Sequence, residues 1–481
     1  MGAARANLEV RREGLYTGRV TGFVCVLVCI GAAAWAAGSN PLIRWNPGIP
    51  GGIPAVAVKA NVRDFGAAGN GVADDAPAIQ KAIDAVDGGA VLIPAGDYVL
   101  RKGLTLAKGV VLRGEGPART RLLFDIEDRA AIRITGGDAG PWTDVVSGCE
   151  FGSSRLRVAD GSLFKAGDFV QIQQENDADV MYTNPMWKAD WAEDSVGQVL
   201  RAGKVSGNEL TLDGPLHITF QARLRPRIRT QRFVERAGVE DLYVQLSPKG
   251  DPVTIGMRNA AYCWARNVES SHTSRGHVNG SVSYRCEIRD SFFHDSHDYG
   301  GGGHGYGVDL GRHVTGWLIE NNIFQRLRHA MLVQVGASGN VFGYNYSIEP
   351  RSQAEWIPCD ISLHGHFPFM NLFEGNTAQK VEVGDYWGPA GPGNTFLRNR
   401  IEAHGMRIRD HSHGQNVIGN ELARAGLEIH ESVKGTWVRN TGDGAIPRSL
   451  YLKRKPRFFG EMSWPAEGKL PAEVRFEKRA R

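Results

Sequence analysis

The sequence predicts an all-β protein folded as a right-handed parallel β-helix, a solenoid with an N-terminal capping helix and an inserted β subdomain. Two observations indicate this class. A short motif recurs at a nearly constant step after residue 234, and the recurring units show short apolar runs with Gly and Asn between them instead of helical periodicity. The 61 glycines in 481 residues suit a backbone that turns several times in each coil.

The recurring motif is a short apolar run that ends in Asn or Asp. The end positions are Asn267, Asp290, Asn321, Asn345, Asn376 and Asn399, and the steps between them are 23, 31, 24, 31 and 23 residues. A coil of about 20–25 residues accommodates three short strands and three turns, since each strand residue rises ~3.3 Å. We therefore expect the Asn side chains to stack in a hydrogen-bonded column. Cys263 and Cys286 share one position in adjacent coils and are expected to be stacked, buried thiols.

A longer motif stands near the N-terminus. The run DFGAAGNGVADD (64–75) precedes a helical pattern over residues 76–86, and GGAVLIPAGDYV (88–99) reads as a buried strand followed by a turn. Together they resemble the N-terminal segment of the pectate lyase and polygalacturonase superfamily of right-handed β-helices. The resemblance implies that this segment caps one end of the β-helix and that the aspartates of the run are structural.

Composition divides the rest of the chain. Residues 1–37 contain an apolar run ending in small residues and read as a signal peptide or N-terminal anchor, 38–58 as a linker and 59–450 as the β-helix domain. Within it, about 140–225 has alternating short strands without the Asn motif and reads as an inserted β subdomain. The basic tail at 451–481 is expected to fold over the C-terminal end.

These features predict an exported protein, periplasmic or secreted, that the N-terminal segment anchors only if it is not cleaved. If that segment is cleaved, we expect no stable membrane span. We also expect the protein to be a monomer. The formal net charge of +4 is close to neutral for this length, and the sequence has no basic stripe, so no nucleic-acid partner is expected.

Histidines indicate where chemistry lies. Ten of the 14 fall between residues 294 and 413, and two coils are longer than the others, at 294–307 and 351–366. Extra length in a solenoid goes into loops, often on the binding face. His297 lies seven residues after Asp290, and Arg328 lies seven after Asn321. This register predicts that His297, Arg328 and His329 share one surface.

Such a group suits β-elimination of a uronate polysaccharide, which requires carboxylate neutralisation, removal of the C5 proton and protonation of the leaving oxygen. His and Tyr transfer protons, and Arg binds a carboxylate through two nitrogens. We therefore expect an acidic polysaccharide substrate. The candidate catalytic residues are His297, His329, Arg328, Tyr306 and Tyr299. The candidate substrate-binding residues are Gln334, His364, His366, Asp385, Tyr386, Trp387 and Arg407.

Two other functions stay open. A glycoside hydrolase needs paired carboxyl groups, for which Asp295, Asp298, Asp309 and Asp385 are candidates, although the polygalacturonase pattern of acidic residues is not reproduced. A non-catalytic glycan-binding protein or adhesin would need no cluster of titratable groups, and the histidine-rich region argues against it.

No cofactor is assigned from the sequence. His-Gly-His (364–366) and His-Ser-His (411–413) have the spacing of zinc-ligand pairs on a strand, but no third ligand is fixed by spacing. Ca²⁺ would need carboxylate clusters, and the candidate carboxylates are scattered. Zn²⁺ and Ca²⁺ therefore stay open, with no metal-binding residue named.

Overall fold

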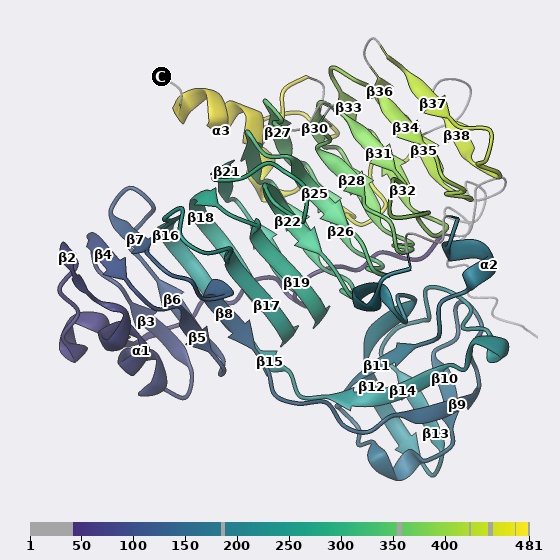
Figure 1. Ribbon diagram of the computed structural model, residues 1–481, viewed down its shortest axis with the longest axis horizontal. Helices are drawn as coiled ribbons and strands as arrows, with labels where there is room; N and C mark the ends of the chain where they lie inside the picture. Colours follow the sequence, from purple (N-terminus) through teal and green to yellow (C-terminus); the bar gives the residue numbers. More distant parts are fainter. Residues whose placement is uncertain are drawn as a thin grey trace, which may run out of the picture. The chain divides into compact units, whose positions relative to one another are not determined.

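The computed structural model describes residues 42–183, 188–353, 358–422, 425–440, 446–466 and 468–479. The expected signal or anchor segment at 1–37 lies outside these residues. Within the described part, no helix is both long and apolar enough to cross a membrane. The predicted all-β class with long parallel sheets is confirmed, because coil after coil pairs in parallel with its neighbour (Figure 1).

Sheet 1, named here, is an 11-stranded sheet formed by one strand from most coils. Its strands are β5 (Leu104–Leu106), β8 (Ala130–Thr135), β15 (Val234–Glu235), β17 (Val253–Ala261), β19 (Gly276–Tyr284), β22 (Tyr306–Leu310), β25 (His329–Val333), β28 (Ile361–Leu363), β31 (Val381–Val383), β34 (Met406–Ile408) and β37 (Leu427–Ile429).

Sheet 2, the 21-stranded sheet, contains the other two strands of each coil. One column holds β1 (Val58–Asn61), β3 (Gly89–Leu92), β6 (Val110–Arg113), β16 (Gly238–Leu246), β18 (Trp264–Thr273), β20 (Glu287–Arg289), β23 (Leu318–Glu320), β26 (Val341–Gly343), β29 (Leu372–Glu374), β32 (Thr395–Leu397), β35 (Asn416–Ile418) and β38 (Trp437–Arg439). The second column holds β2 (Asn70–Asp74), β4 (Gly96–Leu100), β7 (Thr120–Phe124), β21 (Phe292–Ser296), β24 (Ile323–Gln325), β27 (Tyr346–Ile348), β30 (Thr377–Ala378), β33 (Arg400–Ile401) and β36 (Glu421–Leu422).

The bend between the two columns of sheet 2 holds the predicted Asn column. Asn322 donates to Asn345 at 3.0 Å, Asn345 donates to Asn376 at 2.9 Å, and the same bond recurs to Asn399 and beyond. The assignment of Asn267, Asp290 and Asn321 to this position is wrong. All three take the left-handed backbone conformation (φ 51, 55 and 58) at the bend, and Asn322, the neighbour of Asn321, occupies the column.

The interior of the coils is apolar and stacked. Phe342, Phe373 and Phe396 lie in successive coils with ring centroids 5.0 and 5.2 Å apart, close to the inter-strand spacing of ~4.8 Å. Cys263 and Cys286 are buried and unbridged, which confirms the expectation of stacked thiols. Burial raises the pKa of the Cys286 thiol well above its usual value, so it stays protonated.

The segment between β8 and β15 forms a closed barrel beside the coils. Its strands are β9 (Thr143–Ser147), β10 (Arg155–Val158), β11 (Phe169–Gln173), β12 (Gly197–Ser206), β13 (Glu209–Leu212) and β14 (Arg227–Gln231), in the order β10-β13-β12-β11-β14-β9. A short helix, α2 (Ala178–Met181), follows β11. Phe369 and Met370, from a turn of the β-helix, pack into the barrel's own core. The barrel and the coils are therefore joined by packed side chains.

The segment expected as a linker lies against the β-helix where it is described. The indole nitrogen of Trp45 donates to the Met370 carbonyl at 2.8 Å, and the Ile49 amide donates to the buried carboxylate of Glu287 at 2.7 Å. The expected helix forms as α1 (Ala76–Asp84), with Ile79 and Ile83 buried. Its role as a cap stays a prediction.

The C-terminal tail does not fold over the last coil as expected. Helix α3 (Pro471–Arg479) lies on middle coils, where Phe476 contacts Phe292 and Arg479 pairs with Glu269 (Figure 1). These coils offer exposed rings and carboxylates to the apolar and basic side chains of the tail. In the last coil, Val438 remains 44% exposed.

Candidate functional site

The candidate site lies on the outer side of sheet 1, where strands β22, β25 and β28 adjoin. Tyr306 begins β22 and pairs with His329, which begins β25 one coil further on. The predicted pairing of His329 with His297 is therefore wrong. The long loop between β21 and β22 adds residues after His297, so the register counted forward from Asp290 no longer holds on sheet 1.

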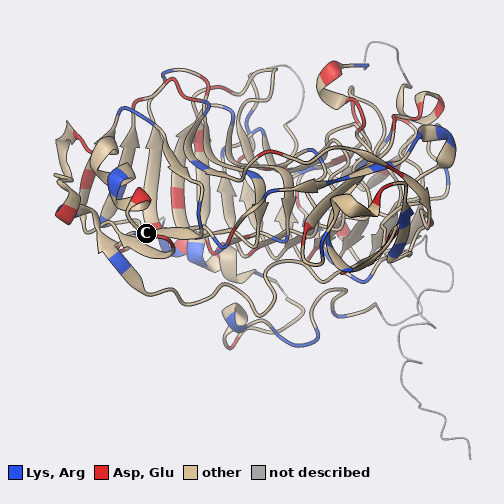
Figure 2. Cartoon of the chain, turned by 90° about the horizontal axis from the view of Figure 1, so that it is seen from below, with Lys and Arg blue, Asp and Glu red and all other residues tan. Residues whose placement is uncertain are grey.

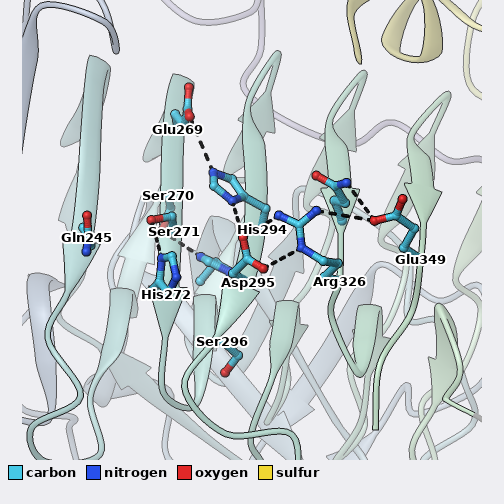
Figure 3. Close-up of polar contacts among 12 residues, drawn as sticks. Gln245, Glu269, Ser270, Ser271, His272, His294, Asp295, Ser296, Arg326 and Glu349 are labelled. Carbon is cyan, nitrogen blue, oxygen red and sulfur yellow. Dashed lines mark hydrogen bonds and ion pairs between the residues drawn. The ribbon is translucent and has the colours of Figure 1, made fainter. Parts of the chain in front are cut away.

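His297 lies on the other side of that loop, with a different set of groups. Its ring is 5.5 Å from the ring of His272, and its Nε2 donates to the Leu246 carbonyl at 2.9 Å. Asp295, two residues before His297 on β21, carries an ion-pair network that Figure 3 shows. Arg326 binds both oxygens of the Asp295 carboxylate at 2.6 Å.

The remaining groups of this network are also paired. His294 bridges Asp295 (2.8 Å) and Glu269 (3.5 Å) in the same view. Burial acts to raise the pKa of Asp295, but the hydrogen bonds from Arg326 and His294 hold it well below its usual range. Each charge thus has an opposite partner, which is typical of a structural network, and Asp295 is a poor candidate for a catalytic acid.

Tyr306 and Arg328 form the centre of the candidate site. The Arg328 Nη2 donates to the Tyr306 hydroxyl at 2.6 Å, and both side chains are nearly completely buried. The hydroxyl in turn lies 3.5 Å from the Nε2 of His364. Burial raises the pKa of Tyr306 to about 12, although the positive charge of Arg328 acts in the opposite direction. Tyr306 therefore keeps its proton at neutral pH and can donate it.

Whereas Tyr306 keeps its proton, His329 stays neutral and keeps a lone pair that can accept one. Its Nδ1 bonds to the Cys359 carbonyl at 3.0 Å, which requires a hydrogen on Nδ1 and leaves Nε2 with the lone pair in the neutral ring. Burial lowers the pKa of His329 well below its usual value, and the charges of His364 and Arg328 act in the same direction. The ring centroids of Tyr306 and His329 are 5.2 Å apart. A proton donor and a proton acceptor thus adjoin.

His364 and Asp385 form a third element of the site. The His364 Nδ1 contacts the Asp385 carboxylate, and the ring of His364 is 5.5 Å from that of His329. Burial acts to raise the pKa of Asp385, but the adjacent His364 holds it below its usual value. The ionised carboxylate fixes the hydrogen on Nδ1 and directs Nε2 toward Tyr306.

A protonatable carboxyl group, Asp309, lies on β22 with Tyr306. Gln334 donates to one of its oxygens at 2.9 Å and Asn279 to the other at 3.0 Å. Burial raises the pKa of Asp309 to about 6, and the bond from Gln334 only partly offsets this effect. Because each amide nitrogen has two hydrogens, Gln334 keeps one that is not used on Asp309.

Two other predicted residues lie apart from this centre. The Tyr299 hydroxyl accepts from the Ser296 amide at 2.9 Å, a bond internal to the long loop. Arg407 lies on β34 in the row that contains Asp309, four strands away, or about 19 Å at ~4.8 Å per strand. It pairs with Glu428 at 3.1 Å. Arg407 therefore lies in the same strand row as Asp309 but far from the Tyr306–Arg328 contact.

Aromatic rings continue the site beyond Asp385. The Trp387 amide donates to the Asp385 carboxylate at 2.9 Å, and Tyr386 is 50% exposed. His366 turns away from His364 because its backbone is left-handed (φ 53), and its ring packs 4.5 Å from that of Trp191. The expectation that His364 and His366 point the same way is therefore wrong.

Metal binding receives no geometric support in this region. Among the residues that the structure describes, no three His, Cys, Asp or Glu side chains are grouped so as to hold a metal ion. Zn²⁺ or Ca²⁺ binding stays a prediction.

Charged residues of both signs alternate over the chain. Lys, Arg, Asp and Glu are interspersed over the coloured chain in Figure 2, with no continuous basic stripe in that view.

Sequence reasoning missed two members of the site, Trp191 and Asn279, and named a third, Asp309, only as one of several candidate acids. Trp191 lies in the inserted barrel, and its sequence neighbourhood gives no sign of a contact with His366. Asn279 precedes the long coils and carries no motif. Asp309 was only one of several scattered carboxylates, and the signal that could have found it is its position three residues after Tyr306 on the same strand.

The fold and the match to known sequences together define the class of protein. A family model described as "Rhamnogalacturonase A/epimerase, pectate lyase-like" matches residues 59–132. The chain folds as a parallel β-helix, and its N-terminal segment is similar to the pectate-lyase-like family, as the N-terminal motif suggested.

Similarity to curated proteins is restricted to short stretches. The chain is 40% identical over 120 residues to the mannuronan C5-epimerase AlgE6 of Azotobacter vinelandii, which is 23% of this chain and 13% of AlgE6. It is 44% identical over 86 residues to AlgE4 of the same organism, 16% of this chain and 15% of AlgE4.

Similarity to solved structures extends over more of the chain. The tailspike protein gp49 from Pseudomonas phage LKA1 superposes with a TM-score of 0.56 at 16% identity, over 75% of this chain and 62% of that chain. At this identity the likeness shows the fold.

Proposed function

We propose that this protein is an exported carbohydrate-active enzyme that cleaves a uronate-containing polysaccharide by β-elimination. The observation that carries the proposal is the contact between two groups held in opposite protonation states: neutral His329 and protonated Tyr306, with ring centroids 5.2 Å apart. Environments that push two titratable groups apart in this way are typical of an acid and base pair.

In this proposal each group has one role. His329 Nε2 takes the C5 proton, and the Tyr306 hydroxyl donates its proton to the leaving oxygen. Arg328 holds the Tyr306 hydroxyl in place and stabilises the phenolate that forms. Asp309 in its protonated form and the second amide hydrogen of Gln334 are placed to bind the uronate carboxylate and so to acidify C5.

The relatives support an acidic polysaccharide as the substrate. The curated proteins that match are named mannuronan C5-epimerases, and epimerisation at C5 also begins with removal of the C5 proton. The two reactions separate at the next step. In a lyase the proton donor serves the leaving oxygen, whereas in an epimerase a proton returns to C5 from the opposite face.

The test is incubation with a panel of acidic polysaccharides that includes mannuronan. We expect ultraviolet absorbance from unsaturated uronate ends, in step with new reducing ends, and loss of both in His329→Ala. Reducing ends without that absorbance would contradict elimination and indicate hydrolysis. Exchange of the C5 hydrogen with deuterated solvent, without cleavage, would indicate epimerisation. If none of these products forms with any polysaccharide of the panel, that result would contradict an enzymatic role.

Hydrolysis is a second candidate because one observation favours it. Two carboxyl groups of the site have pKa values shifted in opposite directions: burial raises that of Asp309 to about 6, and His364 holds that of Asp385 below its usual value. A glycosidase uses such a pair as acid and base. Under this alternative, Asp309→Asn abolishes cleavage, whereas Tyr306→Phe leaves most of it.

A further inference from the structure

The inserted barrel presents a tryptophan at the candidate site. Trp191 belongs to the barrel segment between β11 and β12, and its side chain is 48% exposed. Its ring centroid lies 4.5 Å from that of His366 and 5.6 Å from that of Trp387, both in edge-to-face geometry. Tyr386 adjoins Trp387 at 5.2 Å and is also half exposed. Two large rings, one from each part of the protein, thus remain open to solvent next to Trp387.

Side chains of the β-helix bind the main chain of the Trp191 segment and fix its position. Arg312 donates to the Trp191 carbonyl at 2.7 Å and to the Glu193 carbonyl at 2.6 Å. The Nε2 of His313 donates to the Asp194 carbonyl at 2.9 Å, while its Nδ1 accepts from Gln171 at 2.7 Å. Burial lowers the pKa of His313 to about 3, so the ring is neutral and can act in both ways at once.

These contacts come from the turn that follows β22. The same strand carries Tyr306 and Asp309, so one short stretch of chain positions both the proton donor and the barrel segment that holds Trp191. On the other side, Trp387 is tied by its amide to Asp385, the partner of His364. The aromatic rings are therefore continuous with the candidate catalytic groups.

We propose that Trp191, Trp387 and Tyr386 form a composite subsite, shared by the barrel and the β-helix, that stacks on one pyranose ring of the polysaccharide. The inference rests on the proposed function in naming a polysaccharide as the ligand. A pyranose ring presents C–H groups on its faces and hydroxyls around its edge, and an aromatic ring suits such a face because it offers a large, rigid apolar area. The barrel is then a recognition element of the cleft.

The test compares Trp191→Ala, Trp191→Phe and the control Phe151→Ala by affinity electrophoresis in gels containing each polysaccharide of the panel. Phe151 is an exposed aromatic residue (39%) on a turn of the same barrel. Because Arg312 binds the main-chain carbonyl of residue 191, the segment keeps its position in each variant, and thermal melting checks this. We expect Trp191→Ala to weaken binding and raise KM about tenfold, with kcat at saturation unchanged, and Trp191→Phe to retain most of the affinity.

Equal retardation of the wild type and Trp191→Ala would overturn the subsite. So would a wild type that no polymer of the panel retards. A Trp191→Ala variant that loses kcat with an unchanged KM would overturn it as well. The binding readout also separates the two proposals. A wild type that is retarded by a polymer but makes no product contradicts the proposed function, and loss of that retardation in Trp191→Ala still supports the subsite.

Discussion

Removal of one oxygen, in Tyr306→Phe, tests the catalytic assignment most directly. The ring stays and keeps its packing against His329, so substrate binding is expected to change little. The lost hydroxyl is the proposed proton donor, and general acid catalysis contributes about 10²–10⁴-fold to rates. We therefore expect kcat to fall at least about 100-fold, equivalent to ~2.7 kcal/mol of activation free energy, with KM within about threefold of the wild type.

The same change has a structural cost that must be separated from catalysis. Arg328 loses the hydroxyl that accepts its Nη2 hydrogen at 2.6 Å in a buried environment, which costs about 1–3 kcal/mol of stability. In a domain of this size that corresponds to a few degrees of melting temperature, so the variant stays folded at assay temperature. Tyr299→Phe is the matched control, since its hydroxyl accepts from the Ser296 amide, away from the Tyr306–Arg328 contact. A Tyr306→Phe variant with kcat within threefold of the wild type would refute Tyr306 as the acid.

Three further predictions concern stability. The pKa of Asp309 is about 6 in the folded protein against ~4 in the unfolded chain, so the folded form binds this proton more tightly. The contribution of Asp309 to stability is complete below pH 4 and should fall by ~3 kcal/mol as the pH rises through 6. Thermal melts of Asp309→Asn should lack this pH dependence. Asn345→Ala leaves several buried partners unpaired and should cost ~2–4 kcal/mol, clearly more than Asn440→Ala at the end of the column, in thermal unfolding. Burial raises the pKa of Glu374 to about 7, and its carboxylate accepts a hydrogen bond from the backbone amide of residue 450. Hydrogen exchange of the tail (451–479), corrected for its intrinsic pH dependence, should therefore rise between pH 6 and 8 in the wild type. In Glu374→Gln it should stay flat over the same range.

The stacked coils were predictable because their determinants are local and repeated. Each unit supplies an apolar run and an Asn, and every unit meets the same environment, so the period is visible in the sequence. The one-residue error at Asn267, Asp290 and Asn321 has a physical origin, which is clearest at Asn321. Two asparagines adjoin there, and only the backbone conformation, left-handed at Asn321 (φ 58), decides which of them enters the column.

The site was only partly predictable because it is assembled across elements that the repeat does not describe. His364 was identified by the density of histidines in the long coils, and Arg328 and His329 by their register with His297. Trp191 could not be, since the barrel is an insertion and its contact with His366 depends on how the barrel docks. The position of the Trp191 segment also depends on single hydrogen bonds, such as the one from Arg312 to the Trp191 carbonyl, which have no sequence signature.

The misplacement of His297 shows how register should be counted in a solenoid with long loops. Phe292 pairs with Ile323, an offset of 31 residues, but Tyr306 pairs with His329, an offset of 23. The eight-residue difference is the loop between β21 and β22, and it lies after His297 and before Tyr306. Counting backward from the Asn column removes it, because Tyr306 and His329 each precede their own column asparagine, Asn322 and Asn345, by 16 residues. Loop length thus leaves the strands in register while it changes which side chains accompany them, and the residues that follow a long loop, not those that precede it, lie together on sheet 1.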